Sequence, residues 1–386
     1  MRKIKLSQCG SYVTKERINS NKLNVNNYIT TDNMLPNKEG ICDAEKIPTN
    51  ITVNHFQEND ILLSNIRPYF KKIWKAEYEG GCSADVLIFR TNSGYNADFI
   101  RYCLSQDAFF DYDMKGAKGS KMPRGDKNHI LNFELYDFSL PSQTSIASVL
   151  KVLDNKIILN NKINNELEQM AKTLYDYWFV QFDFPDEKGR PYKSANGKMV
   201  YNEVLKREIP EGWEVIKFDD LVEQAPKLKA IKAPDYKNQG NIPIVDQAST
   251  LITGRTDDMS YYYKNERNCV VFGDVTTCFK YINFPFAKGT DGTKIINAKD
   301  DRIPAILLYQ LLKDTKLPNI GFARHYMFLR EIKLLLPPQD ICEKYYQATK
   351  GIMDLRAKNL KENYKLSITR DFLLPLLMNG QVSVQD

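Results

Sequence analysis

The chain contains two long stretches in which apolar residues recur at helical spacing. The first begins at Pro141 and continues to about Val180 with no further Pro and no Gly. Its apolar positions advance by alternating steps of four and three, the spacing of a seam along one side of a helix. Those positions are Ile146, Leu150, Leu153, Ile157, Leu167, Ala171, Leu174 and Trp178. A helix of this length measures about 55–60 Å, and it needs a partner to bury its seam.

A second stretch of the same kind follows 196 residues further along the chain. Leu336-Pro337-Pro338-Gln339 repeats Leu140-Pro141-Ser142-Gln143, and the run after it is interrupted by Gly351 alone until Pro375 and Gly380 end it. Its seam is predicted to comprise Ile341, Tyr345, Ala348, Ile352, Leu355, Asn359, Leu366 and Leu373. Agreement in opening, length and spacing favours an internal repeat over two unrelated helices. Each of two units is then a globular segment followed by a long helix.

Three asparagines fall on these predicted seams. They are Asn160 and Asn164 in the first stretch and Asn359 in the second. A polar residue in the seam of paired helices favours one register over others, at some cost in stability. The alternative is that these side chains face solvent at a point where the pair is wide.

The remaining segments predict a mixed α/β architecture. Short buried strands are expected at Asp60–Ser64, Asp85–Phe89, Asn268–Phe272 and Lys294–Ile296, and a helix at Ala97–Phe110. We therefore divide the chain into a globular domain at 1–139, a long helix at 140–182, a connector at 183–208, a second globular domain at 209–335 and a second long helix at 336–380. A hairpin is predicted in the connector near Asn196-Gly197.

Composition and charge narrow the class of protein without deciding it. The net charge of +6 over 386 residues permits an acidic partner such as nucleic acid but does not require one. Seven cysteines without a C-x-x-C pair predict buried thiols in a reducing compartment rather than a disulfide framework or a zinc site. No apolar leader and no apolar run of membrane-spanning length is present, so a cytoplasmic location is expected.

No pattern in the chain predicts catalysis. The three histidines lie far apart in sequence, and neither a phosphate-binding G-x-x-x-x-G-K-[ST] loop nor a G-x-S-x-G elbow occurs. Asn283-Phe284-Pro285-Phe286 departs from the Asn-Pro-Pro-Phe motif of amino-methyltransferases at its second position. Pro234-Asp235 is nearly a hundred residues from Glu331-Ile332-Lys333, too far for a typical nuclease motif. The chain is therefore predicted to bind rather than to catalyse.

Two segments of the first half combine cations with aromatic residues or glycines. Cations and aromatics alternate in 65–72, and Gly116 to Lys127 forms a loop with three Gly, one Pro and several cations. A loop of this kind can place backbone N–H groups and cations against phosphates. The alternative is a solvated surface turn.

Several motifs together carry a family resemblance over nearly the whole chain. Around the first helix they are Leu140-Pro141, Leu153-Asp154-Asn155-Lys156-Ile157, Leu159 to Asn164, Leu167 and Tyr177-Trp178-Phe179-Val180. Elsewhere they are 121–127, 208–213, Gly273-Asp274, Thr276, Phe279-Lys280-Tyr281 and 291–294. The combination resembles the DNA-specificity subunit of type I restriction–modification systems. The first half lacks the Pro-Glu-Gly-Trp opening found at 210–213, which leaves the start of the first domain open.

The resemblance implies an α+β fold in which two α/β target-recognition domains are joined by an antiparallel pair of long helices, a coiled coil. Each domain would read one half of a split double-stranded DNA target, and the helices would set the spacer. Two modification (methyltransferase) subunits would dock on this chain, and restriction (translocase and nuclease) subunits would join them. S-adenosylmethionine, ATP and Mg are expected in those partners, with no catalytic residue, metal or cofactor in this chain.

Candidate DNA contacts follow from the chemistry of the cations. Arginine matches guanine in the major groove, whereas lysine contacts phosphates. Base contacts are predicted at Arg67, Arg124 and Arg324. Phosphate contacts are predicted at Lys71, Lys72, Lys118, Lys121, Lys127, Lys264 and Lys280. Further candidates are Arg255, Arg267, Lys294 and His325. The helix-pair contacts are predicted at Ile146, Leu150, Leu153, Ile157, Leu167, Leu174, Ile352, Leu355, Asn359 and Leu366.

Two other functions compete with a DNA-reading scaffold. One is a self-contained restriction or methyltransferase enzyme with degenerate motifs, which would transfer methyl groups without a partner. The other is a coiled-coil adaptor with no role in DNA binding, whose complexes would show no salt-dependent DNA affinity. The sequence gives neither the target bases nor the length of the spacer.

Overall fold

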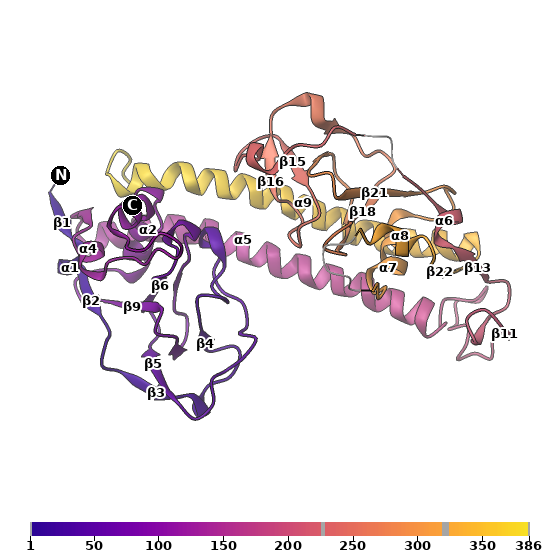
Figure 1. Cartoon of the computed structure of the whole chain (residues 1–386), viewed down its shortest axis with the longest axis horizontal. Coiled ribbons are helices and arrows are strands. Elements are labelled where there is room, and N and C mark those ends of the chain that lie inside the picture. Colours follow the sequence, from indigo (N-terminus) through magenta and orange to yellow (C-terminus); the bar gives the residue numbers. More distant parts are fainter. Residues whose placement is uncertain (1, 225–227, 319–323, 385–386) are drawn as a thin grey trace. The chain divides into compact units, whose positions relative to one another are not determined.

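The computed structural model describes residues 2–224, 228–318 and 324–384. The chain forms two compact units (Figure 1). Unit 1 comprises the residues up to Ile157 together with those from Lys365 onward, and unit 2 comprises Ile158–Tyr364. Two long helices, α5 (Leu140–Tyr175) and α9 (Gln339–Met378), each begin in one unit and end in the other. Each unit therefore contains one globular domain and one half of both helices.

Unit 1 contains two four-stranded sheets. The first, which is antiparallel, has the order β2 (Gly10–Tyr12), β9 (Val86–Thr91), β6 (Ile61–Ser64) and β7 (Ile73–Lys75). The second has the order β3 (Arg17–Asn19), β5 (Thr52–Phe56), β8 (Gly80–Cys82) and β4 (Tyr28–Ile29), and its β4–β8 pair is parallel. A separate pair joins β1 (Lys3–Lys5) to β10 (Glu134–Tyr136). The helices are α1 (Leu6–Cys9), α2 (Ala97–Leu104), α3 (Asp107–Gly116) and α4 (Lys127–Leu131), and the 3-10 turns are η1 (Ser20–Lys22), η2 (Pro36–Lys38) and η3 (Pro68–Phe70).

The predicted helix Ala97–Phe110 is wrong in one respect, because it is divided into α2 and α3. The Ser105 N–H donates to Tyr102 O, which closes the last turn of α2, and Gln106 is extended at φ −69° and ψ 144°. The bend lets both helices bury their aromatic residues in one core, among them Phe99, Phe109 and Phe110.

Unit 2 has the same arrangement. Its antiparallel sheet has the order β14 (Val222–Gln224), β21 (Thr293–Ala298), β18 (Cys269–Gly273) and β19 (Phe279–Ile282). Its mixed sheet has the order β16 (Gly254–Thr256), β15 (Ile242–Val245), β20 (Phe286–Lys288) and β17 (Tyr262–Tyr263). β13 (Glu214–Lys217) pairs with β22 (Lys333–Leu336). The short helices and turns are α6 (Phe218–Leu221), α7 (Ala305–Lys313), α8 (Tyr326–Leu329), η5 (Ala233–Asp235) and η6 (Met259–Tyr261).

The antiparallel sheets of the two domains correspond strand for strand, whereas the mixed sheets differ in where the outer strand pairs: β3 pairs with β5, and β16 pairs with β15. The series β1–α1–β2 in unit 1 matches β13–α6–β14 in unit 2, and the sheet order β2–β9–β6–β7 matches β14–β21–β18–β19. In each unit the first strand pairs with the strand that precedes the long helix. The internal repeat predicted from the two Leu-Pro openings is confirmed by the antiparallel sheets and by the strand pair that precedes each long helix.

The connector forms its hairpin later than predicted. β11 (Met199–Asn202) pairs with β12 (Arg207–Pro210), so the turn lies at 203–206 and not at Asn196-Gly197. The side chain of Asn202 causes this, because its Oδ1 accepts hydrogen bonds from the N–H groups of Val204 and Leu205. Asn196-Gly197 forms an earlier turn, in which the Gly197 N–H donates to Tyr192 O.

The two long helices end by different means. α5 continues into a π-helical segment, η4 (Asp176–Val180). α9 passes through Pro375, which was expected to stop it, and ends at Met378. A proline so close to the end of a helix removes few intrahelical hydrogen bonds, so the last turn persists. Gly380 then has φ +71°, and the N–H groups of Gly380 and Gln381 donate to Leu377 O and Leu376 O, a glycine cap of the Schellman type.

The helix ends belong to the cores of the domains. In unit 1, Ile146, Leu150 and Leu377 pack in the same cluster as Phe99 and Phe110. In unit 2, Trp178, Phe179, Tyr345 and Met353 pack with Trp213. Among the residues with described positions, no helix is both long and apolar enough to cross a membrane. All seven cysteines are free thiols, and five of them are buried.

Candidate nucleic-acid interface and its support

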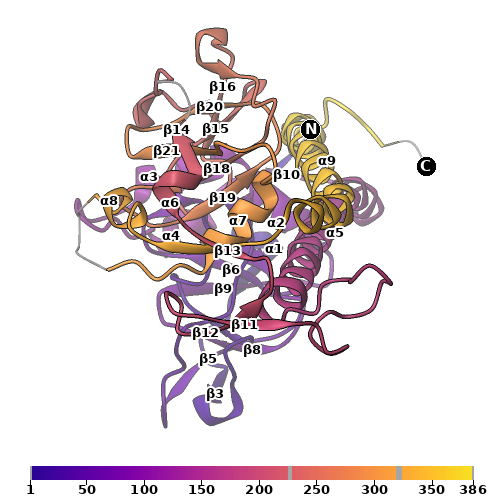
Figure 2. The same ribbon diagram turned by 90° about the vertical axis from the view of Figure 1, so that its right-hand side faces the viewer.

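The two long helices run antiparallel within each unit. In unit 2 the Tyr345 hydroxyl donates to Ala171 O at 3.1 Å, and further along the Asn359 amide donates to Asn164 Oδ1 at 3.0 Å. In unit 1 Arg370 lies 2.9 Å from Asp154. Residue numbers rise on α9 as they fall on α5, and both views show the helices side by side (Figures 1 and 2).

Most predicted seam residues of the pair are buried or half-buried. Ile146, Leu150, Leu167 and Asn359 are buried, and Leu153, Ile157, Leu174, Ile352 and Leu366 are half-buried. The predictions for Ala348 and Leu355 are wrong, because Ala348 is exposed and Leu355 is 43% exposed. The buried positions after Tyr345 are Thr349, Met353 and Arg356, so the seam advances there by four, four and three. A contact between α9 and the domain of unit 2 explains this shift of the seam. Asn283 of that domain donates to Met353 O at 3.0 Å and holds that side of α9 against the domain.

The asparagines of the seam are buried and paired, not exposed. Asn160 is 1% exposed, and its amide donates to Glu362 Oε2 and Asn363 Oδ1, each at 2.8 Å. Asn363 in turn donates to Asn161 Oδ1 at 2.7 Å. Such bonds are lost if one helix slides by a turn, so the asparagines fix the register of the pair in unit 2.

An ion pair with a buried arginine and a partly exposed glutamate follows one turn further along the helices in unit 2. Arg356 of α9 is 8% exposed and pairs with Glu168 of α5. Neither residue was predicted from the sequence. The position of Arg356, three residues before Asn359 on the same seam, was the available signal.

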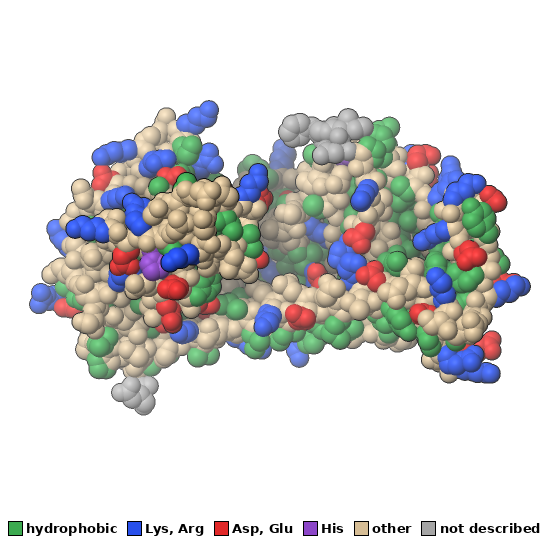
Figure 3. Space-filling view, turned by 90° about the horizontal axis from the view of Figure 1, so that it is seen from below, with side chains coloured by type: hydrophobic (Ala, Val, Ile, Leu, Met, Phe, Trp, Pro, Cys, Tyr) green, Lys and Arg blue, Asp and Glu red, His purple; other side chains and the backbone are tan. Residues whose placement is uncertain are grey.

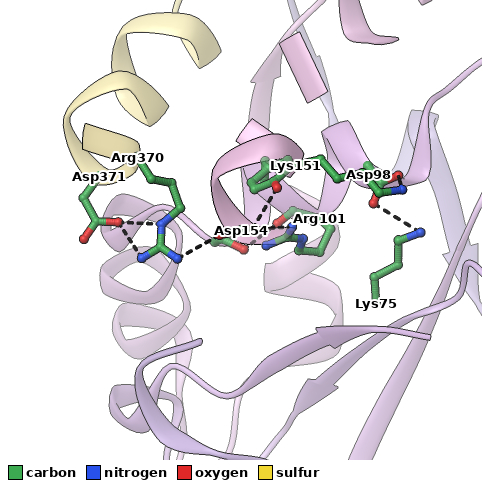
Figure 4. Close-up of polar contacts among 9 residues, drawn as sticks. Lys75, Asp98, Arg101, Lys151, Asp154, Arg370 and Asp371 are labelled. Carbon is green, nitrogen blue, oxygen red and sulfur yellow. Dashed lines mark hydrogen bonds and ion pairs between the residues drawn. The ribbon is translucent and has the colours of Figure 1, made fainter. Parts of the chain in front are cut away.

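Unit 1 contains a larger charged network that joins its domain to both helices (Figure 4). Asp154 of α5 lies between Arg101 of α2 and Arg370 of α9, at 2.9 Å from each, and accepts a hydrogen bond of 2.7 Å from the Tyr102 hydroxyl. Burial opposes the charged carboxylate, but the two guanidinium groups outweigh it and hold the pKa of Asp154 below its usual value. Asp154 therefore stays ionised and fixes α2 to the helices.

A second part of this network extends to the sheet of unit 1. Asp98 of α2 pairs with Lys75 of β7 at 3.2 Å and with Lys151 of α5 at 3.3 Å (Figure 4). Arg370 also contacts Asp371 at 2.8 Å. Asp154 belongs to a motif of the first long helix, but no local pattern connects it with α2, because its arginine partners lie 53 and 216 residues away.

The glycine-rich basic loop of unit 1 is ordered by its own contacts. Lys118 and Arg124 exchange two backbone hydrogen bonds of 2.9 Å, and Lys118 pairs with Asp126 at 2.7 Å. The Lys118 ammonium and the N–H groups at the start of α4 lower the pKa of Asp126 to about 2. Arg124 lies 3.1 Å from Asp85 and is 55% exposed. Lys121 and Lys127 are exposed on the same loop.

Arg67 is brought to this loop, as its predicted role requires. The Arg67 N–H donates to Pro123 O at 2.8 Å, and Ile66 pairs with Arg124 in a β-bridge. The side chain of Arg67 is half-buried. Lys71 pairs with Asp107 at 2.9 Å, and Lys72 donates to Thr31 O. The predicted contacts of the first half thus lie in two adjoining loops.

Two predicted contacts of the second half are wrong. Lys280 is 5% exposed, and its ammonium donates to the carbonyl oxygens of Asp246 and Thr250. His325 is 1% exposed, and its Nδ1 lies 3.0 Å from Asp274 O. Both side chains hold loops of the domain together, and neither can reach DNA as it stands. A sequence cannot separate a cation that supports a loop from one on its surface.

The other cations of the second half differ in the contacts that their side chains make within the domain. Arg255 stacks on the Tyr364 ring at 3.1 Å from its centroid and donates to Gly240 O. Arg267 pairs with Glu223 and Asp301, Lys264 pairs with Glu266, and Lys294 lies 3.8 Å from Asp274. Arg324 is exposed. On the face shown in Figure 3, Lys and Arg side chains are interspersed with acidic ones and form no continuous basic field.

Comparison with known proteins identifies sequences that are similar to this chain. Over 317 residues the chain is 26% identical to the type I restriction enzyme MjaIX specificity subunit of Methanocaldococcus jannaschii, with 76% of this chain and 71% of that protein covered. Over 318 residues it is 23% identical to the HindI specificity subunit of Haemophilus influenzae, covering 62% and 67% of the two chains. The chain is thus a relative of type I restriction specificity subunits. The resemblance predicted from the sequence is confirmed.

The fold agrees with a solved structure of a type I restriction–modification S subunit. The S subunit of a type I restriction–modification system from M. genitalium superposes with a TM-score of 0.53 at 14% identity, over 98% of this chain and 96% of that one. The predicted fold class, two α/β domains joined by long helices, is confirmed. No family model matches the chain.

Proposed function

We propose that this chain is the DNA specificity subunit of a type I restriction–modification complex and has no catalytic activity of its own. Each domain reads one half of a bipartite target, and the paired helices set the distance between the half-sites. The observation that carries the proposal is the repeat of two domains whose antiparallel sheets have the same strand order, each attached to the same antiparallel helices. A duplicated reader suits a target with two separate parts.

The proposed base contacts are Arg67 and Arg124 in the first domain and Arg324 in the second. Arg124 is exposed while its guanidinium is oriented by Asp85, which suits a planar, bidentate contact to guanine. The proposed phosphate contacts are Lys71, Lys72, Lys118, Lys121, Lys127, Lys264, Arg267 and Lys294. Arg255 is proposed as a support of its loop, since its ring stack occupies it. Lys280 and His325 are not proposed as DNA contacts, because both side chains are buried.

The modification subunits are proposed to dock on an exposed apolar stripe of α5 and of η4, the π-helical segment that continues it. In unit 2, Leu159, Met170 and Tyr177 are 50%, 55% and 40% exposed, and Ile163 between them is half-buried. The steps of four, seven and seven place them along one side of the helix, away from the seam that contacts α9. A second helix laid along this stripe would bury it.

The partners supply the chemistry in this proposal. Two methyltransferase subunits bind S-adenosylmethionine and flip an adenine from each half-site, and restriction subunits use ATP and Mg. This chain positions them on double-stranded DNA in the cytoplasm. Methyl transfer by the purified chain alone, given S-adenosylmethionine and DNA, would contradict the proposal.

An exchange of domains tests the division of labour. Residues 209–335 are replaced by the corresponding domain of the M. jannaschii relative, and the methylated sites are mapped genome-wide in a host that carries the system. We expect one half of the target to change while the other half and the spacer remain. The reciprocal exchange of residues 1–139 serves as the matched control and should change the other half. A target that changes in both halves, or in neither, would refute the assignment of one half-site to each domain.

A further inference from the structure

The loop between β6 and β7 presents two adjacent aromatic rings to solvent. Tyr69 and Phe70 are 47% and 38% exposed, and their ring centroids lie 4.7 Å apart. Both belong to η3, whose first residue, Pro68, is buried. Two neighbouring aromatic rings on the tip of a loop form a small exposed apolar patch, which a partner can bury by stacking.

The backbone of this turn is held in an unusual conformation. Arg67 and Lys71, which flank Pro68–Phe70, have positive φ values of 49° and 53°. Residues other than glycine rarely adopt this region, and such positions cluster where a protein holds a shape for function. The counterpart turn in unit 2, between β18 and β19, carries Asp274 to Cys278 and no aromatic residue. The aromatic tip is therefore not required by the repeated fold.

Backbone hydrogen bonds fix the turn on both sides. The Arg67 N–H donates to Pro123 O, the Lys38 N–H donates to Lys71 O, and the Ser64 N–H donates to Lys72 O. Within the turn, the N–H groups of Phe70 and Lys71 donate to Arg67 O and Pro68 O. A turn anchored in this way loses little conformational freedom when its tip inserts into a partner.

The charges around the tip favour a polyanion as that partner. Arg67, Lys71, Lys72 and Lys38 surround η3, while Lys38 and Lys71 share the single carboxylate of Asp107, at 3.2 and 2.9 Å. Cations therefore outnumber the carboxylates that pair with them. The Arg67 and Pro123 contact also joins the turn to the loop that carries Lys121 and Arg124.

We propose that Tyr69 and Phe70 insert as a wedge between two base pairs of the half-site read by the first domain, while the flanking cations hold the phosphates on either side. This inference rests on the proposed DNA-reading function and adds a mode of reading to it. Apolar wedges unstack a base step and kink the duplex, and easily unstacked steps are read as sequence in this way. The rigid turn and its cations supply both requirements of a wedge.

The test uses the chain in complex with its modification subunits, on a duplex that carries the mapped target. 2-Aminopurine replaces single bases across the first half-site, excluding the methylated adenine, because base flipping also raises its fluorescence. We expect binding to raise the fluorescence at one base step. The double variant Tyr69→Ala, Phe70→Ala should abolish the rise and weaken specific binding about ten- to a hundredfold. Tyr201→Ala, an exposed tyrosine in β11, is the matched control and should change neither.

The outcomes separate the wedge from the function on which it rests. A complex that methylates no bipartite sequence would refute the proposed function. A complex that methylates its target but shows no bright step, or keeps the bright step in the double variant, would refute the wedge. Loss of the modification subunits from the purified double variant would show that the tip contacts protein instead, and this too would overturn it.

Discussion

Asp154 concentrates three interactions on one carboxylate, and its loss should be costly. Asp154→Asn keeps the size of the side chain but leaves Arg101 and Arg370 without their shared partner, so unit 1 should lose about 3 kcal/mol of stability. Because the pKa of Asp154 is lowered in the folded chain, its contribution is present above the unfolded pKa of about 3.9 and is lost as the pH falls through the folded value. The difference in stability between wild type and variant should therefore shrink below about pH 4. Chemical denaturation at several pH values measures it.

Asp371→Asn provides the control for that measurement. Asp371 contacts Arg370 as well, but 43% of its side chain is exposed, and exposed pairs contribute about 0–1 kcal/mol. Equal losses in the two variants would show that Asp154 is no more than another surface charge.

Asp113 presents the opposite case, a buried carboxyl whose charge is unfavourable. It is fully buried in α3, and neither oxygen has a hydrogen-bond partner among the described residues. Burial raises the pKa of Asp113 to about 6, although His129 opposes the shift. A carboxyl with a raised folded pKa stabilises the fold most at low pH, and this contribution is lost as the pH rises from about 4 to about 6.

The corresponding prediction is a gain of stability. Asp113→Asn should stabilise the chain by about 2 kcal/mol at pH 7 and remove the fall in stability between about pH 4 and pH 6. Thermal unfolding across that range measures both effects. Asp111→Asn, at an exposed position of the same helix, should leave the pH profile as it is. A profile unchanged by Asp113→Asn would mean that this carboxyl finds a donor in solution.

Arg124 tests the assignment of base contacts against phosphate contacts. Arg124→Ala should relax discrimination at one base position by about 1–3 kcal/mol, whereas Lys121→Ala should weaken binding to all sequences alike and reduce its salt dependence. Binding to a panel of single-base variants of the target, at two salt concentrations, measures both. If Arg124→Ala weakens binding uniformly, Arg124 contacts a phosphate.

At the scale of elements, polar contacts give the helix pair a fixed register in unit 2. Asn160 and Asn164 bond across the seam to Asn363 and Asn359, and the Arg356 to Glu168 pair follows on the same side. A helix seam of leucines alone would permit several registers of similar energy. The polar positions permit one.

The proposed role of the helices in setting the spacer predicts how the spacer responds to the length of α5 and α9. A seven-residue insertion of helix-forming sequence after Ile157 of α5, combined with one after Tyr364 of α9, lengthens both helices by about 10.5 Å and preserves the seam. We expect the spacer of the methylated target to grow by about three base pairs, at about 3.4 Å each. The insertion in α5 alone should make the asparagine pairs incompatible with the Asp154 to Arg370 pair, because these lie on opposite sides of the insertion, and should abolish methylation. An unchanged spacer in the double insertion would mean that the helices do not set it.

At the scale of the whole chain, the repeat was visible in sequence through its helices and not through its domains. The Leu-Pro openings and the long seams are local patterns, and local patterns survive divergence because every turn of a helix must bury the same side. The domains share the order of strands in their antiparallel sheets, yet the strands that correspond differ in sequence. Topology is set by which strands pair across the chain, and many sequences satisfy the same pairing.

The candidate contacts show where prediction from sequence stops. The sequence by itself determined the two long helices, their pairing, most of their seam and a basic loop, which lies beside Arg67 in the structure. It did not separate exposed cations from buried ones such as Lys280, and it did not predict the Asp154 network. It also placed Leu355 in the seam, where Met353 and Arg356 lie instead. The physical reason is the distance along the sequence between the residues that determine each property. Helical periodicity is a property of neighbouring residues, whereas burial, ion pairing and the shape of a recognition surface depend on residues that the fold brings together from distant parts of the chain.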